Sequence, residues 1–250
     1  MTDLKSEYPI IENWDDYSDL HIELLRGIYS YGFEKPSPIQ QRAILPIINK
    51  HDLIAQAQSG TGKTGCFSIG TLQLLDLNNK NVQAIIISPT RELATQIFSV
   101  ITDLGKQMND FNAKLLIGGT SISSDLNDFK EKIYQCVVGT PGRIYDLINR
   151  RAINTNEMKI LVIDEADEML SQGFQQQIYN IFQYMPETLQ IALFSATLPP
   201  EVEELTKKFM RDPIKILVKQ NMLTLEGISQ YYVALEDDET KYLTLKDLYT

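Results

Sequence analysis

Residues 52–64 read DLIAQAQSGTGKT, and this stretch decides the fold. Its first five residues form an apolar run, which is typical of a buried strand. The eight residues that follow fit the phosphate-binding pattern G-x-x-x-x-G-K-[ST], except that Ala57 stands in place of the first glycine. A strand, a glycine-rich loop, a lysine–threonine pair and a helix in this order predict an α/β domain that binds phosphate.

The chemistry of this loop depends on small residues. Because Gly60 and Gly62 lack side chains, backbone N–H groups can close around phosphate oxygens. A helix that begins near Gly62 would direct its positive end at the same anion. Lys63 can reach the β- and γ-phosphates, and the Thr64 hydroxyl can bind Mg²⁺. The alternative is a strand-to-helix turn without a ligand.

Apolar runs alternate with amphipathic helices along the chain. The predicted strands lie at residues 52–56, 82–88, 113–117, 136–139, 159–163, 189–194 and 214–218. The predicted helices include residues 20–28, 39–48, 93–104 and 174–185. This alternation predicts a doubly wound parallel sheet with helices on both faces, in which ligands bind at the carboxyl ends of the strands.

Composition and charge limit the possible functions. The sequence has 250 residues, of which 43% are hydrophobic, and a formal net charge of −10. That charge argues against a broad basic surface for nucleic acid. Cys66 and Cys136 have neither metal-ligand nor disulfide spacing, which fits a reducing compartment. Without a long apolar run, we expect a cytoplasmic protein with no membrane partner, and a nuclear location stays open.

A second polar group follows the predicted strand at 159–163. Residues 164–167 read Asp-Glu-Ala-Asp. The first carboxylate can hold Mg²⁺ through water, and the adjacent one can orient or deprotonate an attacking water. Acidic residues here could also be no more than the favoured first turn of a helix. The functional reading therefore depends on the phosphate loop earlier in the chain.

Taken together, the motifs resemble those of the DEAD-box RNA helicases. In that family's order they are GFEKPSPIQ at 32–40, AQSGTGKT at 57–64, PTRELA at 89–94, GG at 118–119, TPGR at 140–143, DEAD at 164–167 and SAT at 195–197. Longer strings, such as QQRAILP, VIDEADEML and TKKFMRDPI, are similar to translation initiation factors of the 4A type. The resemblance covers roughly residues 14–250 and implies a RecA-like fold of the P-loop NTPase class.

The resemblance implies that ATP and Mg²⁺ are cofactors. Gln40 would read the adenine edge, Phe33 would stack on the ring, and Lys35 would contribute nearby. The implied phosphate contacts are Gly60, Thr61, Gly62, Lys63, Thr64 and Gly65, the metal contacts are Thr64 and Asp164, and the catalytic residues are Lys63, Asp164 and Glu165. Asp167, Ser195 and Thr197 would couple the nucleotide state to unwinding.

Single-stranded or duplex RNA is the implied partner, held by its sugar–phosphate backbone. The implied contacts are Pro89, Thr90, Arg91, Gly118, Gly119, Thr140, Pro141, Gly142 and Arg143. Glycines and helix N-termini can bind phosphates without a basic surface, and the two arginines would add charge-assisted bonds. Such contacts tolerate any base sequence, and the 2′-OH would select RNA. By themselves, TPGR and GG are also simple turn signals.

The same reading divides the chain into three parts. Residues 1–13 are expected to be a flexible tail, residues 14–218 the ATP-binding domain, and residues 219–250 a linker and the start of a second RecA-like domain. In that last part we predict a strand at 228–235, a turn at 236–239 and a helix from Lys241. Trp14 could lie near the adenine, or could be a core or surface residue.

The expected function is ATP-dependent unwinding of RNA or remodelling of RNA–protein complexes, in translation initiation. The partners would be a second RecA-like domain and an initiation scaffold protein. We find no ARGxD-like or HRxGRxxR-like segment, where the family carries its arginine finger. Since such a finger contributes about 10³–10⁵ in rate, weak activity is expected of this chain alone. The alternatives are a non-catalytic lobe that docks on a scaffold or competes with intact helicase, and a DNA-acting or purely ATPase relative.

Overall fold

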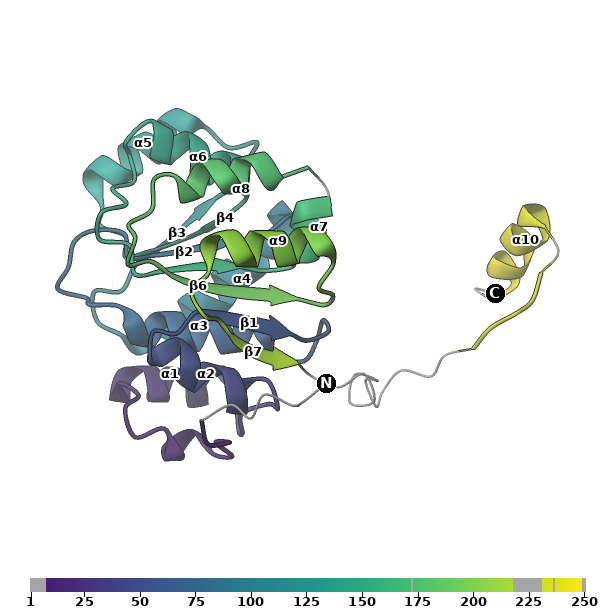
Figure 1. The fold of residues 1–250 in the computed structure, drawn as a ribbon, viewed down its shortest axis with the longest axis horizontal. Helices are drawn as coiled ribbons and strands as arrows, with labels where there is room; N and C mark the ends of the chain where they lie inside the picture. Colours follow the sequence, from purple (N-terminus) through teal and green to yellow (C-terminus); the bar gives the residue numbers. More distant parts are fainter. Residues whose placement is uncertain (1–7, 172, 218–230, 236, 249–250) are drawn as a thin grey trace. The chain divides into compact units, whose positions relative to one another are not determined.

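The computed structural model describes residues 8–171, 173–217, 231–235 and 237–248 (Figure 1). The chain divides into two compact units, Met1–Val218 and Lys219–Thr250. Each unit is described by itself below. Within the described ranges, no helix combines the length and the apolar character needed to cross a bilayer.

A seven-stranded parallel sheet forms the centre of the first unit. Its strands lie side by side in the order β3-β4-β2-β5-β6-β1-β7. Their bounds are β1 Leu53–Gln56, β2 Ala84–Ile87, β3 Ala113–Leu116, β4 Cys136–Gly139, β5 Ile160–Ile163, β6 Gln190–Ser195 and β7 Ile214–Leu217. Each observed strand lies at a predicted apolar run, so the predicted sheet is confirmed.

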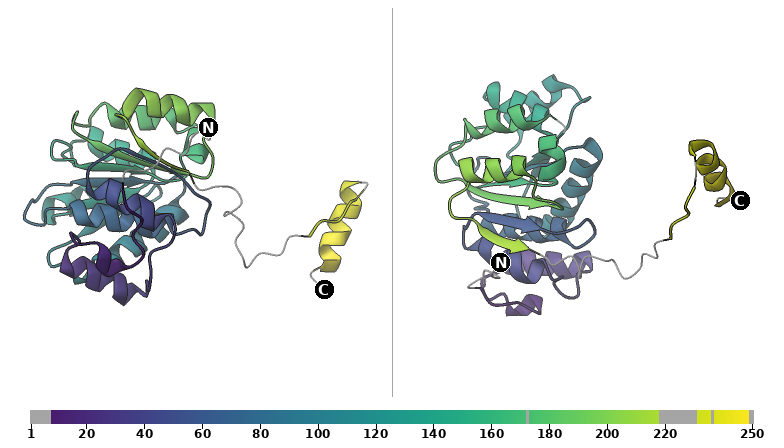
Figure 2. Two further views of the ribbon diagram at one scale, coloured as in Figure 1. Left: turned by 60° about the horizontal axis from the view of Figure 1, so that its bottom comes forward. Right: turned by 45° about the vertical axis from the view of Figure 1, so that its right-hand side comes forward.

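Helices cover both faces of this sheet. They are η1 Trp14–Asp16, α1 Ile22–Tyr31, α2 Gln40–Ile48, α3 Lys63–Leu74, α4 Arg91–Leu104, η2 Gly105–Gln107, α5 Ile122–Glu131, α6 Pro141–Asn149, α7 Ala166–Ser171, α8 Gln175–Phe182 and α9 Pro200–Phe209. Figure 1 shows α1 to α3 on one side and α6, α8 and α9 on the other, and Figure 2 gives two further views of the same layers.

Alternate residues of each central strand enter different cores. In β1, Leu53 and Ala55 belong to the core beneath α1 to α4, whereas Ile54 belongs to the core beneath α6 to α9. In β6, Phe194 and Leu193 divide in the same way. Because side chains alternate between the faces of a strand, a strand covered on both faces must be apolar throughout.

The second unit differs from the sequence-based prediction. Residues 231–235 form no strand and are exposed, while residues 228–230 lie outside the described part of the chain. A lone strand has no neighbour for its backbone hydrogen bonds, which explains why the prediction is wrong for residues 231–235. The predicted turn at 236–239 is also shorter, because helix α10 already begins at Asp238 and runs to Leu248. The predicted linker at 219–227 lies outside the described residues.

Candidate functional site

The candidate site lies where three neighbouring strands end. The strands β5, β6 and β1 are adjacent in the sheet, and each is followed by one of the polar motifs. In an open parallel sheet, the carboxyl ends of the strands form the usual ligand-binding edge. The topology thus brings the phosphate loop, the DEAD segment and the SAT segment to one place.

The phosphate loop is closed against the motif that precedes α2. Gly62 has φ of +99°, and a Cβ there would lie 2.6 Å from Ser37 Oγ. The Gln40 amide links the two segments, because Nε2 donates to the Gly62 carbonyl over 3.1 Å and Oε1 accepts from the Ser37 amide over 2.8 Å. Gln40 is therefore buried beside the loop. Helix α3 begins at Lys63, as the sequence predicts.

An ion pair connects the phosphate loop to the DEAD segment. Lys63 Nζ lies 2.9 Å from Glu165 Oε1, and both side chains are largely buried. Glu165 has φ of +48°, a left-handed conformation that is strained for a residue with a side chain. Such strain costs about 1–3 kcal/mol and concentrates at functional sites. The lysine expected at the phosphates and the carboxylate expected at the attacking water are thus in direct contact.

Asp164 has the properties of a metal-binding carboxylate. It is 5% exposed, and its Oδ1 has no hydrogen-bond partner. Burial, opposed by Lys63 and reinforced by Glu165, raises the pKa of this carboxyl to about 7. No group of three or more His, Cys, Asp or Glu gathers around a metal position in the described ranges. One carboxylate and the half-buried Thr64 fit Mg²⁺, which keeps several waters and takes its other ligands from phosphates.

The SAT segment is bonded directly to the last residue of DEAD. The Asp167 amide donates to Ser195 Oγ over 3.2 Å. Asp167 Oδ2 accepts from the Thr197 amide over 3.0 Å and from Thr197 Oγ1 over 2.6 Å. Burial alone would raise the pKa of Asp167, but the hydrogen bonds from Thr197 and Ser195 lower it below its ordinary value. The three residues predicted to couple therefore form one network.

Aromatic residues adjoin the phosphate loop on the side of α1. Phe33 stacks with Trp14 at a ring-centroid distance of 6.2 Å, and Tyr31 packs edge-on against Phe33 at 4.8 Å. A Cβ at Gly65 would lie 2.8 Å from Phe33 Cε2, so Gly65 permits this contact. Trp14 is 1% exposed and is a core residue, which decides between the alternatives for it. Lys35 is exposed in the same loop.

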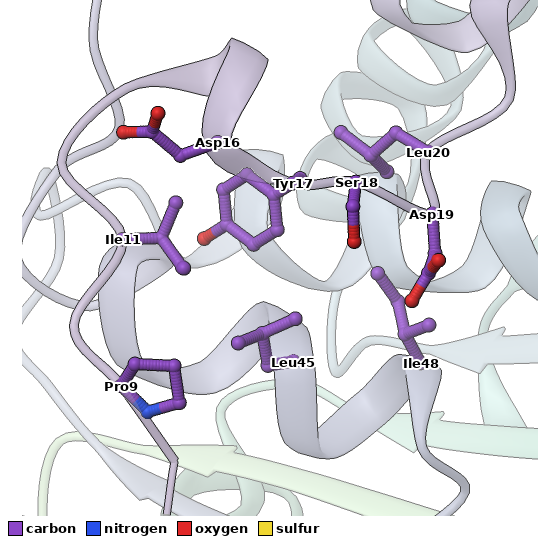
Figure 3. A pocket seen from close by; sticks show the side chains of 9 residues that line it. All are labelled: Pro9, Ile11, Asp16, Tyr17, Ser18, Asp19, Leu20, Leu45 and Ile48. Carbon is purple, nitrogen blue, oxygen red and sulfur yellow. The ribbon is translucent and has the colours of Figure 1, made fainter.

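The cavity shown in Figure 3 lies apart from the phosphate loop. Its volume is about 160 Å³, and Pro9, Ile11, Asp16, Tyr17, Ser18, Asp19, Leu20, Leu45 and Ile48 line it. Tyr17 turns its hydroxyl to the Gln40 carbonyl over 2.9 Å, so one wall of the cavity supports the start of α2.

Residues implied in RNA contact lie at the ends of β2, β3 and β4. The Thr90 hydroxyl caps α4 by accepting from the Leu93 amide over 3.2 Å, and the exposed Arg91 begins that helix. Gly119 has φ of +89°, and a Cβ there would lie 2.7 Å from Arg91 Nη1. Pro89 is buried beside Thr90. The structure therefore places the GG turn against the Arg91 guanidinium.

The TPGR segment forms the first turn of α6, but its arginine points inward. Thr140, Pro141 and Gly142 occupy the N-terminal end of the helix. Arg143 is 9% exposed, and its guanidinium bonds to Thr120 and Asp125. Asp125 was not among the residues predicted for the site. The sequence signal for Asp125 is its place in the helical pattern. It lies on the face that also carries Ile122, Leu126 and Phe129, where apolar residues are expected.

Comparisons with known proteins find similar sequences and similar folds. A sequence profile described as DEAD/DEAH box helicase matches residues 37–205. The chain is 56% identical, over 98% of its length, to an ATP-dependent RNA helicase eIF4A of Emericella nidulans, and 57% identical over 96% to the one of Mycosarcoma maydis. It spans 61% and 58% of those relatives, respectively.

Solved structures give the same result. The fold is similar to S. cerevisiae Dbp5 bound to RNA and ADP BeF3, with a TM-score of 0.84 and 34% identity over 96% of this chain and 60% of that one. It is also similar to a DEAD box protein from the hyperthermophile Methanococcus jannaschii, with a TM-score of 0.78 and 37% identity over 95% of this chain and 63% of that one.

Proposed function

We propose that this chain, which belongs to the DEAD/DEAH box helicase family, is the ATP-binding lobe of an ATP-dependent RNA helicase. It would couple ATP binding and hydrolysis to local unwinding of RNA or remodelling of RNA–protein complexes. The observation that carries the proposal is the contact between Lys63 and Glu165 beside the buried Asp164. The identity of 56% to an eIF4A helicase supports a role in translation initiation. In that role, a scaffold protein of initiation would be a partner.

The ion pair suggests how the chain's own residues act on ATP. When the phosphates arrive, Lys63 would exchange the Glu165 carboxylate for phosphate oxygens. Glu165 would then be free to accept a proton from the attacking water or to orient it. Thr64 and Asp164 would hold Mg²⁺, which neutralises the charge that develops on the phosphates.

RNA would be bound through backbone groups at the ends of β2, β3 and β4. Gly118, Gly119 and the first turn of α6 present backbone amides, and Arg91 presents a charged group beside them. Backbone amides at helix N-termini bind phosphates well, so a net charge of −10 does not prevent such binding. A second RecA-like domain would supply the arginine finger, for which the sequence shows no segment.

The test compares ATP turnover by this chain and by a two-lobe version, each with single-stranded RNA, with single-stranded DNA and without nucleic acid. We expect stimulation by RNA, and only in the two-lobe version. Lys63→Met should abolish that turnover, whereas Lys80→Met, which removes an exposed lysine, should leave it unchanged.

Each other outcome has a definite meaning. Equal turnover in both versions would show that the lobe carries a complete site. Equal stimulation by DNA would contradict the assignment to RNA. No turnover in either version would favour a non-catalytic docking lobe.

A further inference from the structure

A largely buried cluster of charged residues adjoins the turn at Gly118 and Gly119 (the GG turn), away from the phosphate loop. Arg143 of α6 pairs with Asp125 of α5, with 2.5 Å between Nη1 and Oδ2. The side chains are only 7% and 6% exposed. Lys114 of β3 approaches the other oxygen of Asp125 at 3.4 Å and also bonds to Asp128. The cluster thus joins one strand and two helices.

The cluster reaches the GG turn through Thr120. Arg143 Nη1 donates to Thr120 Oγ1 and Nη2 donates to the Thr120 carbonyl, each over 2.8 Å. Thr120 Oγ1 also donates to the Ile117 carbonyl over 3.0 Å, which closes the turn. The next residue, Ser121, caps α5 and thereby fixes the turn to the helix that carries Asp125. One planar guanidinium therefore holds the turn at two points.

Burial separates the roles of the two arginines beside this turn. Arg91 is exposed and packs against Gly118 and Gly119. Arg143 is buried, and the Asp125 carboxylate matches its charge. A buried ion pair of this kind is weak grounds for a gain in stability, because desolvation offsets the attraction. Its geometry, however, fixes the position of the turn relative to the N-terminus of α6.

We propose that Arg143 and Asp125 are positioning residues for RNA binding. This inference rests on the proposed function. The pair holds the amides of the GG turn and those of the TPGR turn at a fixed spacing. RNA then binds without a cost for ordering two loops, which is the advantage of a preorganised site.

The decisive variant is Asp125→Asn, measured by titration of the chain with a mixed-sequence single-stranded RNA. If charge alone mattered, removing the negative charge of Asp125 should tighten RNA binding, because it reduces Coulomb repulsion of the phosphates. Positioning predicts the opposite sign, a loss of about tenfold. The matched control is Asp128→Asn, which removes the same charge from the same helix but leaves the bonds of Arg143 intact. It should bind RNA as tightly as the unaltered chain or slightly more tightly.

Salt dependence distinguishes positioning from direct contact. Arg91→Gln should reduce the slope of log affinity against log salt by about 0.7–1, as expected for one lost phosphate contact. Arg143→Lys keeps a positive charge but lacks the planar fork whose two nitrogens bond Thr120 and Asp125 together. It should therefore bind RNA about tenfold more weakly with an unchanged slope. Near-normal RNA affinity for a folded Arg143→Lys variant would overturn the proposal.

Two further measurements separate misfolding and the proposed function from this inference. Nucleotide affinity should stay within about twofold in every variant, because the cluster lies outside the phosphate site. Amide exchange at Gly118–Thr120, measured without RNA, should accelerate in Asp125→Asn and not in Asp128→Asn, and equal exchange in both would overturn the positioning role. A chain that exchanges as expected but does not bind RNA would instead overturn the RNA function and, with it, the purpose assigned to the pair.

Discussion

At the scale of single residues, the contact between Lys63 and Glu165 leads to a prediction in which binding and turnover separate. Glu165→Gln removes the carboxylate that engages Lys63 over 2.9 Å, so the lysine is more available to phosphate. In the two-lobe protein we expect turnover to fall about 10²–10⁴-fold, the usual contribution of a general base. Nucleotide affinity should hold or increase. Turnover assays and titration with a fluorescent ATP analogue measure both, and Glu187→Gln on the exposed surface is the control. A parallel loss of affinity would contradict the exchange of partners.

Asp164 leads to a second residue-scale prediction, on stability against pH in the metal-free chain. Burial raises its pKa from 3.8 to about 7, so the folded state holds the proton more tightly than the unfolded state. The stability contributed by this proton is complete at low pH and is lost as pH rises through about 7. Urea midpoints measured in EDTA from pH 5 to 8 should therefore fall less steeply for Asp164→Asn than for the unaltered chain. Asp19→Asn, at an exposed position, should keep the original slope.

At the scale of elements, the central strands could be predicted because each is covered on both faces. Short continuous apolar runs such as Ile160–Ile163 are typical of strands that are buried on both faces of a parallel sheet. The strand expected at 228–235 is absent from its described residues 231–235, because an apolar run alone does not supply a neighbouring strand. Helix α5 was not predicted, since the buried Asp125 interrupts its apolar face. Pairings between distant residues decide such cases, and no local pattern encodes them.

The close contact between α1 and the end of α4 gives an element-scale prediction. Gly27 lies in α1, and a Cβ there would be 2.0 Å from the Leu104 carbonyl oxygen. Gly27→Ala must separate these elements and should lower the free energy of unfolding by about 1–3 kcal/mol, as other overpacked sites do. The control is Gly142→Ala in α6, where nothing lies within 4 Å of the added Cβ. That change should leave stability unchanged or raise it by about 0.5–1 kcal/mol. Equal unfolding midpoints for both variants would show that α1 can shift away from Leu104 without loss of stability, against the prediction.

At the scale of the whole molecule, the motifs predicted which segments meet but not how they bond. The parallel topology alone requires that the loops after β1, β5 and β6 share one edge. Three hydrogen bonds depend instead on side-chain geometry across the sheet edge. They join Gln40 to the phosphate loop, Lys63 to Glu165 and Arg143 to Thr120. Motif spacing cannot distinguish an exposed arginine from a buried one, and Arg143 is buried and bonds to Thr120 and Asp125.

The division of the chain at Val218 leads to the last prediction, on independent folding. Both cores are built from residues of the first unit, and no described residue of α10 is buried. A chain that ends at Val218 should therefore unfold within about 2 °C of the full chain, since a loss of 1 kcal/mol shifts a domain of this size by about 2–4 °C. Ending the chain at Pro213 instead removes β7, which pairs with β1 and contributes the buried Ile216. That deletion should cost about 2–5 kcal/mol, the range for removing a large buried side chain. Calorimetry of the three lengths measures this, and an equal loss for both deletions would mean that residues 219–250 stabilise the first unit.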